Sequence, residues 1–440
     1  MLKTFRNAWK IPELRKKLLM TIFIVILYRL GAMVPVPFIN SNVMGNVFGS
    51  SMGGSLFQYM DIISGSAFSQ ATLFALSISP YITASIVIQL LSVAIPALER
   101  LSKQGEEGKK ILTQWTRIIT VVLGLITAFG YYMTMKNNFN FSVTQLGGDI
   151  LTKEGKSVFG AIVIIGCYVA GTALVMWLAE QINEFGIGNG ISIILFANIL
   201  AGTMGIIETL KAFILTGPWG IVIAEVIVIA SLAIITFVVF ITESERRLPV
   251  QYAKKVVGRK MYGGQSTHLP IKLNMSGVMP IIFANSIVAL PSTLALMFPP
   301  KAGGIWEKIV NFFSPNEWFY PLFFAVLIVA FAYFYISISF NPVEVSNNLK
   351  KNGGFIPGIR PGKPTSDYIT KVLNRIVLIG AFFLCIVAII PMIANWVSGG
   401  VLQGIAFGGS SLLIVVGVVL ETAREIEGQM TMRHYKGFLE

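Results

Sequence analysis

Long uncharged apolar runs follow one another along the chain, separated by short polar segments. A helix needs roughly 20 apolar residues to cross a hydrocarbon core of about 30 Å, so each run of that length predicts a membrane span. Residues 376–420 contain no charge, and a turn between Pro391 and Gly404 divides them into two spans. The pattern predicts ten spans, near 18–36, 71–96, 113–135, 157–179, 190–210, 218–241, 274–298, 317–340, 372–394 and 402–420.

The runs are apolar on every side and do not alternate as the strands of a membrane barrel do. Only helices and closed barrels satisfy the backbone in lipid, so we predict an all-α polytopic membrane protein. The composition agrees, with 54% hydrophobic and 12% charged residues. The first run contains Arg29 and lacks a small-residue cleavage site, which indicates a retained helix and not a signal peptide. Cys167 and Cys385 fall inside spans and are interpreted as small buried hydrophobes.

Basic residues are concentrated on one side of the predicted topology. Segments 1–17, 98–117, 242–273, 341–371 and 421–440 hold 26 of the 34 Lys and Arg residues, and the segments on the opposite side hold six. The positive-inside rule therefore predicts a multi-pass protein of the cytoplasmic (inner) membrane with both termini in the cytoplasm. Anchoring of this kind explains much of the net charge of +13, although basic loops also suit RNA or acidic partner surfaces.

A division after the fifth span gives two five-helix halves, 1–217 and 218–440. An odd number of spans makes the second half enter the membrane from the opposite side, so the halves would be inverted. We expect a central pore and a seam between them. The second half carries the long cytoplasmic loops 242–273 and 341–371.

Ionisable residues are scarce inside the spans. Arg29 near the outer end of the first span and Glu225 just inside the sixth are close enough to an interface to snorkel. His268 and His434 fall in cytoplasmic segments, so the spans hold no His-based catalytic or metal-binding group. No complete phosphate-binding loop occurs. We therefore expect no catalytic residue, no cofactor and no metal site, with transport energy supplied by a partner.

One apolar segment is too short to span. Residues 56–63 follow the Gly/Ser-rich run 49–55 and are separated from the next span by Ser64-Gly65-Ser66. A half-helix at membrane depth needs a surrounding of protein or water. An interfacial helix in the outer leaflet is the alternative that the residues leave open.

Several motifs resemble the SecY family. They are residues 75–91 (ALSISPYITASIVIQLL), 185–193 (FGIGNGISI), 274–280 (NMSGVMP), Asn341-Pro342 and 355–362 (FIPGIRPG). The motifs occur in family order across essentially the whole chain. The resemblance implies a gated channel that passes signal-bearing unfolded polypeptides across the membrane and releases hydrophobic segments sideways into lipid.

The resemblance also implies a plug, residues 55–67, and an apolar pore ring. The plug residues would be Leu56, Phe57, Tyr59, Met60, Ile62 and Ile63. The ring would be Ile78, Ile82, Ile191, Leu195, Ile282 and Ile414, with Leu195 replacing the isoleucine common in the family. Residues 78/82 and 191/195 are i, i+4 pairs on one helix face. In a chain this rich in isoleucine, such pairs also fit lipid-facing or core positions.

The family's lateral gate lies between helices two and three and helices seven and eight. Its polar candidates here are Thr83, Gln89, Asn274 and Asn285, which could hydrogen-bond across a closed seam at about 1 kcal/mol each. Contacts within their own half are the alternative.

The two long cytoplasmic loops differ from ordinary connectors. β-prone and basic residues in 242–255 predict a protruding hairpin, and three prolines stiffen 341–371. Candidates for phosphate or carboxylate contacts with a partner are Arg246, Arg247, Lys254, Lys255 and Arg360. Solvated residues that only set topology are the alternative. The partners implied by the resemblance are SecE, SecG, the SecA motor, the ribosome, signal-bearing preproteins and the lipid bilayer.

Two other classes of protein remain as alternatives to a passive channel. A secondary transporter for a small solute is the nearer one, and the sparse intramembrane charge argues against it. A membrane enzyme is the other, and the missing catalytic groups argue against it more strongly.

Overall fold

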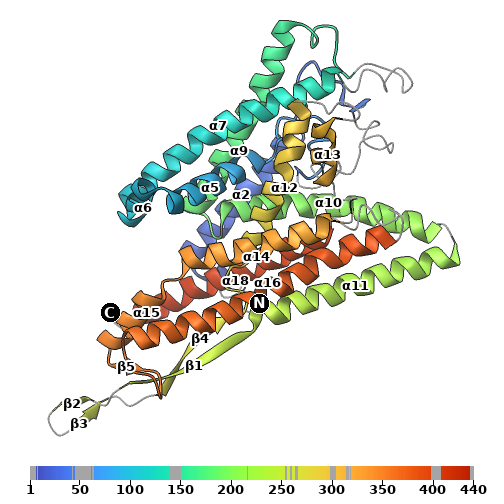
Figure 1. Ribbon diagram of the computed structural model, residues 1–440. Helices are drawn as coiled ribbons and strands as arrows, with labels where there is room; N and C mark the ends of the chain where they lie inside the picture. The colour runs from blue at the N-terminus through green and yellow to red at the C-terminus, as the bar shows by residue number, and fades with distance from the viewer. Residues whose placement is uncertain are drawn as a thin grey trace.

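The structure is a computed structural model that describes residues 6, 8–41, 43–44, 61, 64–137, 150–215, 217–252, 255–257, 260–262, 266–297, 304–313, 317, 319–397 and 408–436. Most of these residues are helical (Figure 1). The helices are α2 (Pro12–Gly31), α5 (Ser79–Ala94), α6 (Pro96–Lys103), α7 (Glu106–Asn137), α9 (Val158–Phe185), α10 (Gly190–Leu215), α11 (Pro218–Glu243), α12 (Met279–Met297), α13 (Ile305–Phe312), α14 (Tyr320–Ser339), α15 (Pro342–Lys351), α16 (Lys363–Val397) and α18 (Gly408–Lys436).

Each predicted span overlaps one of these helices, and the chain is an all-α polytopic membrane protein. In the described part of the chain, α7, α9, α11, α16 and the run Tyr320–Lys351 are long and apolar enough to cross a membrane. The pair α5 and α6 passes the same test but is bent by 103°, and α10 and α12 contribute shorter apolar stretches. The number ten is consistent with this arrangement and stays a prediction.

Two groups of helices are visible, with α5, α7 and α9 above and α11, α14, α16 and α18 below (Figure 1). Contacts link α7 to both α5 and α9 in the upper group, and α16 to both α14 and α18 in the lower group. Helix α12 packs on α14 and also on α7 and α5, so it joins the groups along one edge. Helix α10 also joins the two groups, because it packs on α9 of the upper group and on α11 and α18 of the lower group. That the halves 1–217 and 218–440 are inverted stays a prediction.

The polypeptide from Ser64 to Ile78 is a series of turns, which corrects the prediction of a helix from residue 71. Its polar backbone groups bond to surrounding protein. The amide of Leu73 donates to the carbonyl of Val34 at 2.9 Å, and the hydroxyl of Tyr131 donates to the carbonyl of Phe68 at 2.6 Å. Non-helical backbone is tolerated at membrane depth when protein encloses it in this way.

Prolines set the ends of the helices that follow. Helix α5 begins at Ser79 with Pro80 in its first turn, where a missing N–H costs nothing. It ends at Ala94, and Pro96 begins α6 after the sharp bend. A proline at either position inside one continuous helix would remove a hydrogen bond and clash with the preceding turn.

The predicted hairpin is present at one end of the molecule. Strand β1 (Glu245–Tyr252) pairs antiparallel with β4 (Ser266–Lys272), and β2 (Lys255–Val257) pairs with β3 (Lys260–Tyr262) farther out (Figure 1). Strand β5 (Gly354–Phe355) from the second long loop adds to the other edge of β1. Leu248 and Val250 of β1 pack with Ile356 and Ile369 beneath this sheet, so the two loops form one unit.

Candidate functional site

The six predicted ring residues come from four elements that converge on one place. Ile78 precedes α5 and Ile82 lies in its first turn, Ile191 and Leu195 lie on α10, Ile282 on α12 and Ile414 on α18. Five of them are only 1–6% exposed and belong to a single buried cluster. Ile191 is partly buried and packs against that cluster.

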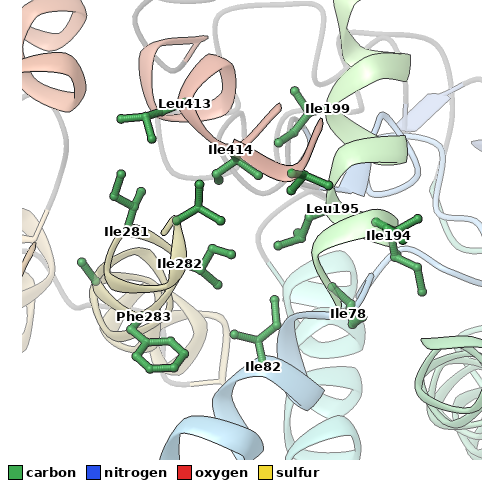
Figure 2. Close-up of a cluster of buried hydrophobic side chains, with 14 of the residues drawn as sticks. Ile78, Ile82, Ile194, Leu195, Ile199, Ile281, Ile282, Phe283, Leu413 and Ile414 are labelled. Atoms are coloured by element: carbon green, nitrogen blue, oxygen red, sulfur yellow. The ribbon is translucent and has the colours of Figure 1, made fainter. Parts of the chain in front are cut away.

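The side chains of Ile82, Leu195, Ile282 and Ile414 point toward a common centre, whereas Ile281 points away (Figure 2). These four line a cavity of about 140 Å³. The ring side chains are all aliphatic and offer no hydrogen-bonding group, whereas polar residues such as Thr83 and Asn285 line other parts of the same cavity. Their role as a pore constriction stays a prediction.

Sequence reasoning missed Ile199, which lines the same cavity and faces the same centre in Figure 2. It lies one helical turn beyond Leu195 on α10, on the face that Ile191 and Leu195 share. The i, i+4 repeat 191, 195, 199 was therefore a signal that could have found it.

The predicted gate residues divide into two pairs. Thr83 on α5 and Asn285 on α12 line the ring cavity from two helices that contact each other, and their role in a gate stays a prediction. The amide of Gln89 donates to Ser85 of its own helix at 3.3 Å. The amide oxygen of Asn274 accepts from Ser276 at 3.4 Å. Gln89 and Asn274 thus make the local contacts that were the alternative for them.

The six predicted plug residues, 56–57, 59–60 and 62–63, lie outside the described residues. Asp61 is described, and its carboxylate accepts a hydrogen bond from the amide of Ser69 at 2.8 Å. Burial raises the pKa of the Asp61 carboxyl, and the bond from Ser69 opposes this shift. The hydroxyl of Ser64 accepts from the amide of Phe68 at 3.0 Å. Hydrogen bonds within 61–69 thus add to the contacts with Val34 and Tyr131 that hold these turns.

The predicted docking residues that the structure describes lie on strands β1 and β2 and on the loop that contains β5. Arg246 and Arg247 are exposed on β1, and Arg247 pairs with Glu245 at 2.7 Å. Arg360 is exposed, and its backbone carbonyl accepts a hydrogen bond from the hydroxyl of Thr365 at 2.8 Å. Lys255 lies in β2, and Lys254 falls outside the described residues.

A mixed-charge cavity of about 410 Å³ lies between β4, the end of α11, residues 274–278 before α12, and α18. Burial and the nearby Arg424 cation lower the pKa of Lys272. Arg424 in turn donates to the carbonyl of Thr242 at 2.6 Å and pairs with Glu243 at 3.1 Å. These bonds cap the end of α11, where a cation is favourable. Among the described residues, no group of His, Cys, Asp and Glu could hold a metal ion.

Comparison with known proteins identifies the family. The SecY family model matches residues 72–423. The chain is 44% identical to the protein translocase subunit SecY of Streptomyces galbus and 41% identical to that of Mycobacterium tuberculosis, with each alignment covering 100% of both proteins. The chain belongs to the SecY family.

Solved structures agree with the family fold at lower identity. A protein-conducting channel covers 94% of this SecY-family chain, with 92% of its own length matched, at 17% identity and a TM-score of 0.66. Sec61 in the canine ribosome-channel complex matches the same shares at 16% identity and a TM-score of 0.62. At such identities the likeness establishes the fold, and the ring, gate and docking roles must be argued from the residues themselves.

Proposed function

We propose that this SecY-family chain forms a gated channel that passes signal-bearing unfolded polypeptides across the membrane and releases hydrophobic segments into lipid. The observation that carries the proposal is the convergence of aliphatic side chains from α5, α10, α12 and α18 on one cavity. An aliphatic constriction lets an extended chain of any sequence slide through, since it makes no specific hydrogen bonds.

The same cavity extends to the helices of the proposed lateral gate. Leu123 and Ile126 of α7 line it together with Thr83 of α5 and Asn285 of α12. Separation of α12 from α5 and α7 would open the cavity toward lipid. A signal sequence offers an apolar core of 7–15 residues that could occupy that opening.

The proposal includes partners and an orientation. The chain would assemble with SecE and SecG and receive polypeptide from SecA or the ribosome at the exposed cytoplasmic arginines. Both termini would lie in the cytoplasm, as the positive-inside rule requires.

Reconstitution with SecE, SecA, ATP and a signal-bearing precursor tests the function. Precursor should reach the vesicle lumen only when the signal is intact, whereas a solute transporter would move no precursor. Cysteines at positions 83 and 285 should crosslink to the apolar core of an arrested signal. Crosslinks confined to α2 and α16 would contradict the placement of the gate.

A further inference from the structure

A polar network lies directly behind the ring. Asn198 of α10 is 0% exposed, and its amide nitrogen donates to the hydroxyl of Ser77 at 2.9 Å. Its amide oxygen accepts from the Arg29 guanidinium of α2 at 3.4 Å. Among the described residues, no carboxylate lies within ion-pair distance of Arg29. The network therefore joins α2, α10 and the turns from Ser64 to Ile78.

The backbone is unusual where this segment meets the network. Ser77 has φ +53°, a left-handed conformation that residues with a side chain rarely adopt. Gly65 has φ +64°, and a Cβ there would lie 2.8 Å from the Arg29 guanidinium and 2.8 Å from the Asn198 carbonyl oxygen. A strained conformation persists only where surrounding contacts enforce it. The bond from Asn198 is such a contact for Ser77.

The network is adjacent to two ring residues. Ile78 follows Ser77 in the chain, and Leu195 lies about one turn before Asn198 on α10. We propose that the Ser77–Asn198–Arg29 hydrogen bonds position Ile78 and Leu195 and thereby set the resting aperture of the ring. This inference rests on the proposed channel function. Hydrogen bonds suit the task because they are directional, whereas aliphatic contacts alone tolerate sliding and repacking.

Two substitutions remove the network with little change in packing. Asn198→Leu replaces the amide by an apolar group of similar size. Ser77→Gly removes the hydroxyl and accepts φ +53° without strain, so it should fold even if other variants do not. Thr203→Ala is the matched control on α10, since its hydroxyl bonds only within its own helix, to the Leu200 carbonyl at 2.5 Å.

The measurement is ion conductance in planar bilayers, in a background that lacks residues 56–63 and keeps Gly65, which lies against Arg29 and Asn198. Without the plug segment, conductance reports the ring itself and not the seating of the plug. We expect Asn198→Leu and Ser77→Gly each to raise conductance at least twofold. The double variant should match the larger single effect, because both changes break one network. Arg29→Lys should retain part of the wild-type behaviour, and Arg29→Leu should not.

Three outcomes decide between this inference and its alternatives. Conductance equal to the background for both substitutions would overturn the positioning role. An equal rise in Thr203→Ala would also overturn it, because the effect would then be general loosening of α10. Failure of the unaltered chain to transport precursor would refute the proposed function, whereas unchanged conductance in both variants of a chain that does transport precursor would refute the network's role alone.

Discussion

Tyr131 offers a test of whether the turns from Ser64 to Ile78 keep the proposed channel closed. Its hydroxyl, on a side chain only 1% exposed, donates to the Phe68 carbonyl at 2.6 Å. Tyr131→Phe removes this bond and keeps the ring contacts with Phe68 and Tyr168, whose centroids lie 4.5 and 5.2 Å away. The change therefore isolates one hydrogen bond.

The free energy lost in Tyr131→Phe depends on the hydrogen bonds that the Phe68 carbonyl keeps. The Phe68 oxygen still accepts from the amide of Ala71 at 3.1 Å, so it is not left wholly unsatisfied. The loss should lie at the low end of the range for buried groups, about 1–2 kcal/mol. If opening breaks the bond to Tyr131, the ratio of open to closed channels should rise about 5- to 30-fold.

The assay is ion leak from proteoliposomes, with Tyr132→Phe as the control. Tyr132 is the next residue of α7, is also buried, and donates to the carbonyl of Gly155 at 3.2 Å, outside these turns. Tyr131→Phe should leak and Tyr132→Phe should not, while both lose similar thermal stability. Equal leak in the two variants, or none in Tyr131→Phe, would refute the reasoning.

Two further predictions concern the scaffold and the cytoplasmic face. Gly171→Ala would drive a Cβ into the Leu73 carbonyl oxygen and should lower the free energy of unfolding by about 1–3 kcal/mol. Gly166→Ala on the same helix meets open space and should leave thermal unfolding unchanged. Arg360→Glu should leave expression and topology unchanged, because the side chain is exposed and the loop keeps four other basic residues. It should weaken partner binding by about 2 kcal/mol and so reduce the rate of precursor transport roughly 30-fold, and Lys363→Glu should reduce that rate less. Normal transport by Arg360→Glu would make that loop a topological anchor only.

The spans were predictable because each is a local property of its own residues. Apolar runs and prolines placed both ends of α11 to within two residues, although α7 begins seven residues before its predicted span and α9 ends six residues after it. The turns from Ala71 to Ile78 were not predictable, because their apolar composition also fits a helix. What stabilises the turns is distant in sequence, such as Val34 and the Tyr131 hydroxyl.

In the candidate site, too, local features were predictable and contacts between distant residues were not. The i, i+4 spacing could group Ile78 with Ile82, but it could not bring α12 and α18 to the same cavity. Asn198 carried no signal at all, since its partners Arg29 and Ser77 lie 169 and 121 residues away. The pairing of β5 with β1 likewise joins Gln251 to Phe355, far apart in the sequence.

That pairing makes the β4–β1–β5 sheet a connection between three helices. Strand β1 continues from α11 through Ser244, and β5 lies between α15 and α16. Strand β4 leads toward α12, and the amide of Leu273 in this connection is tethered to the Ser244 carbonyl at 2.9 Å. A force applied to the hairpin is therefore transmitted to the end of α11 and to the beginnings of α12 and α16. A partner that binds either loop would therefore transmit force to α12, a helix of the proposed gate, without contacting it.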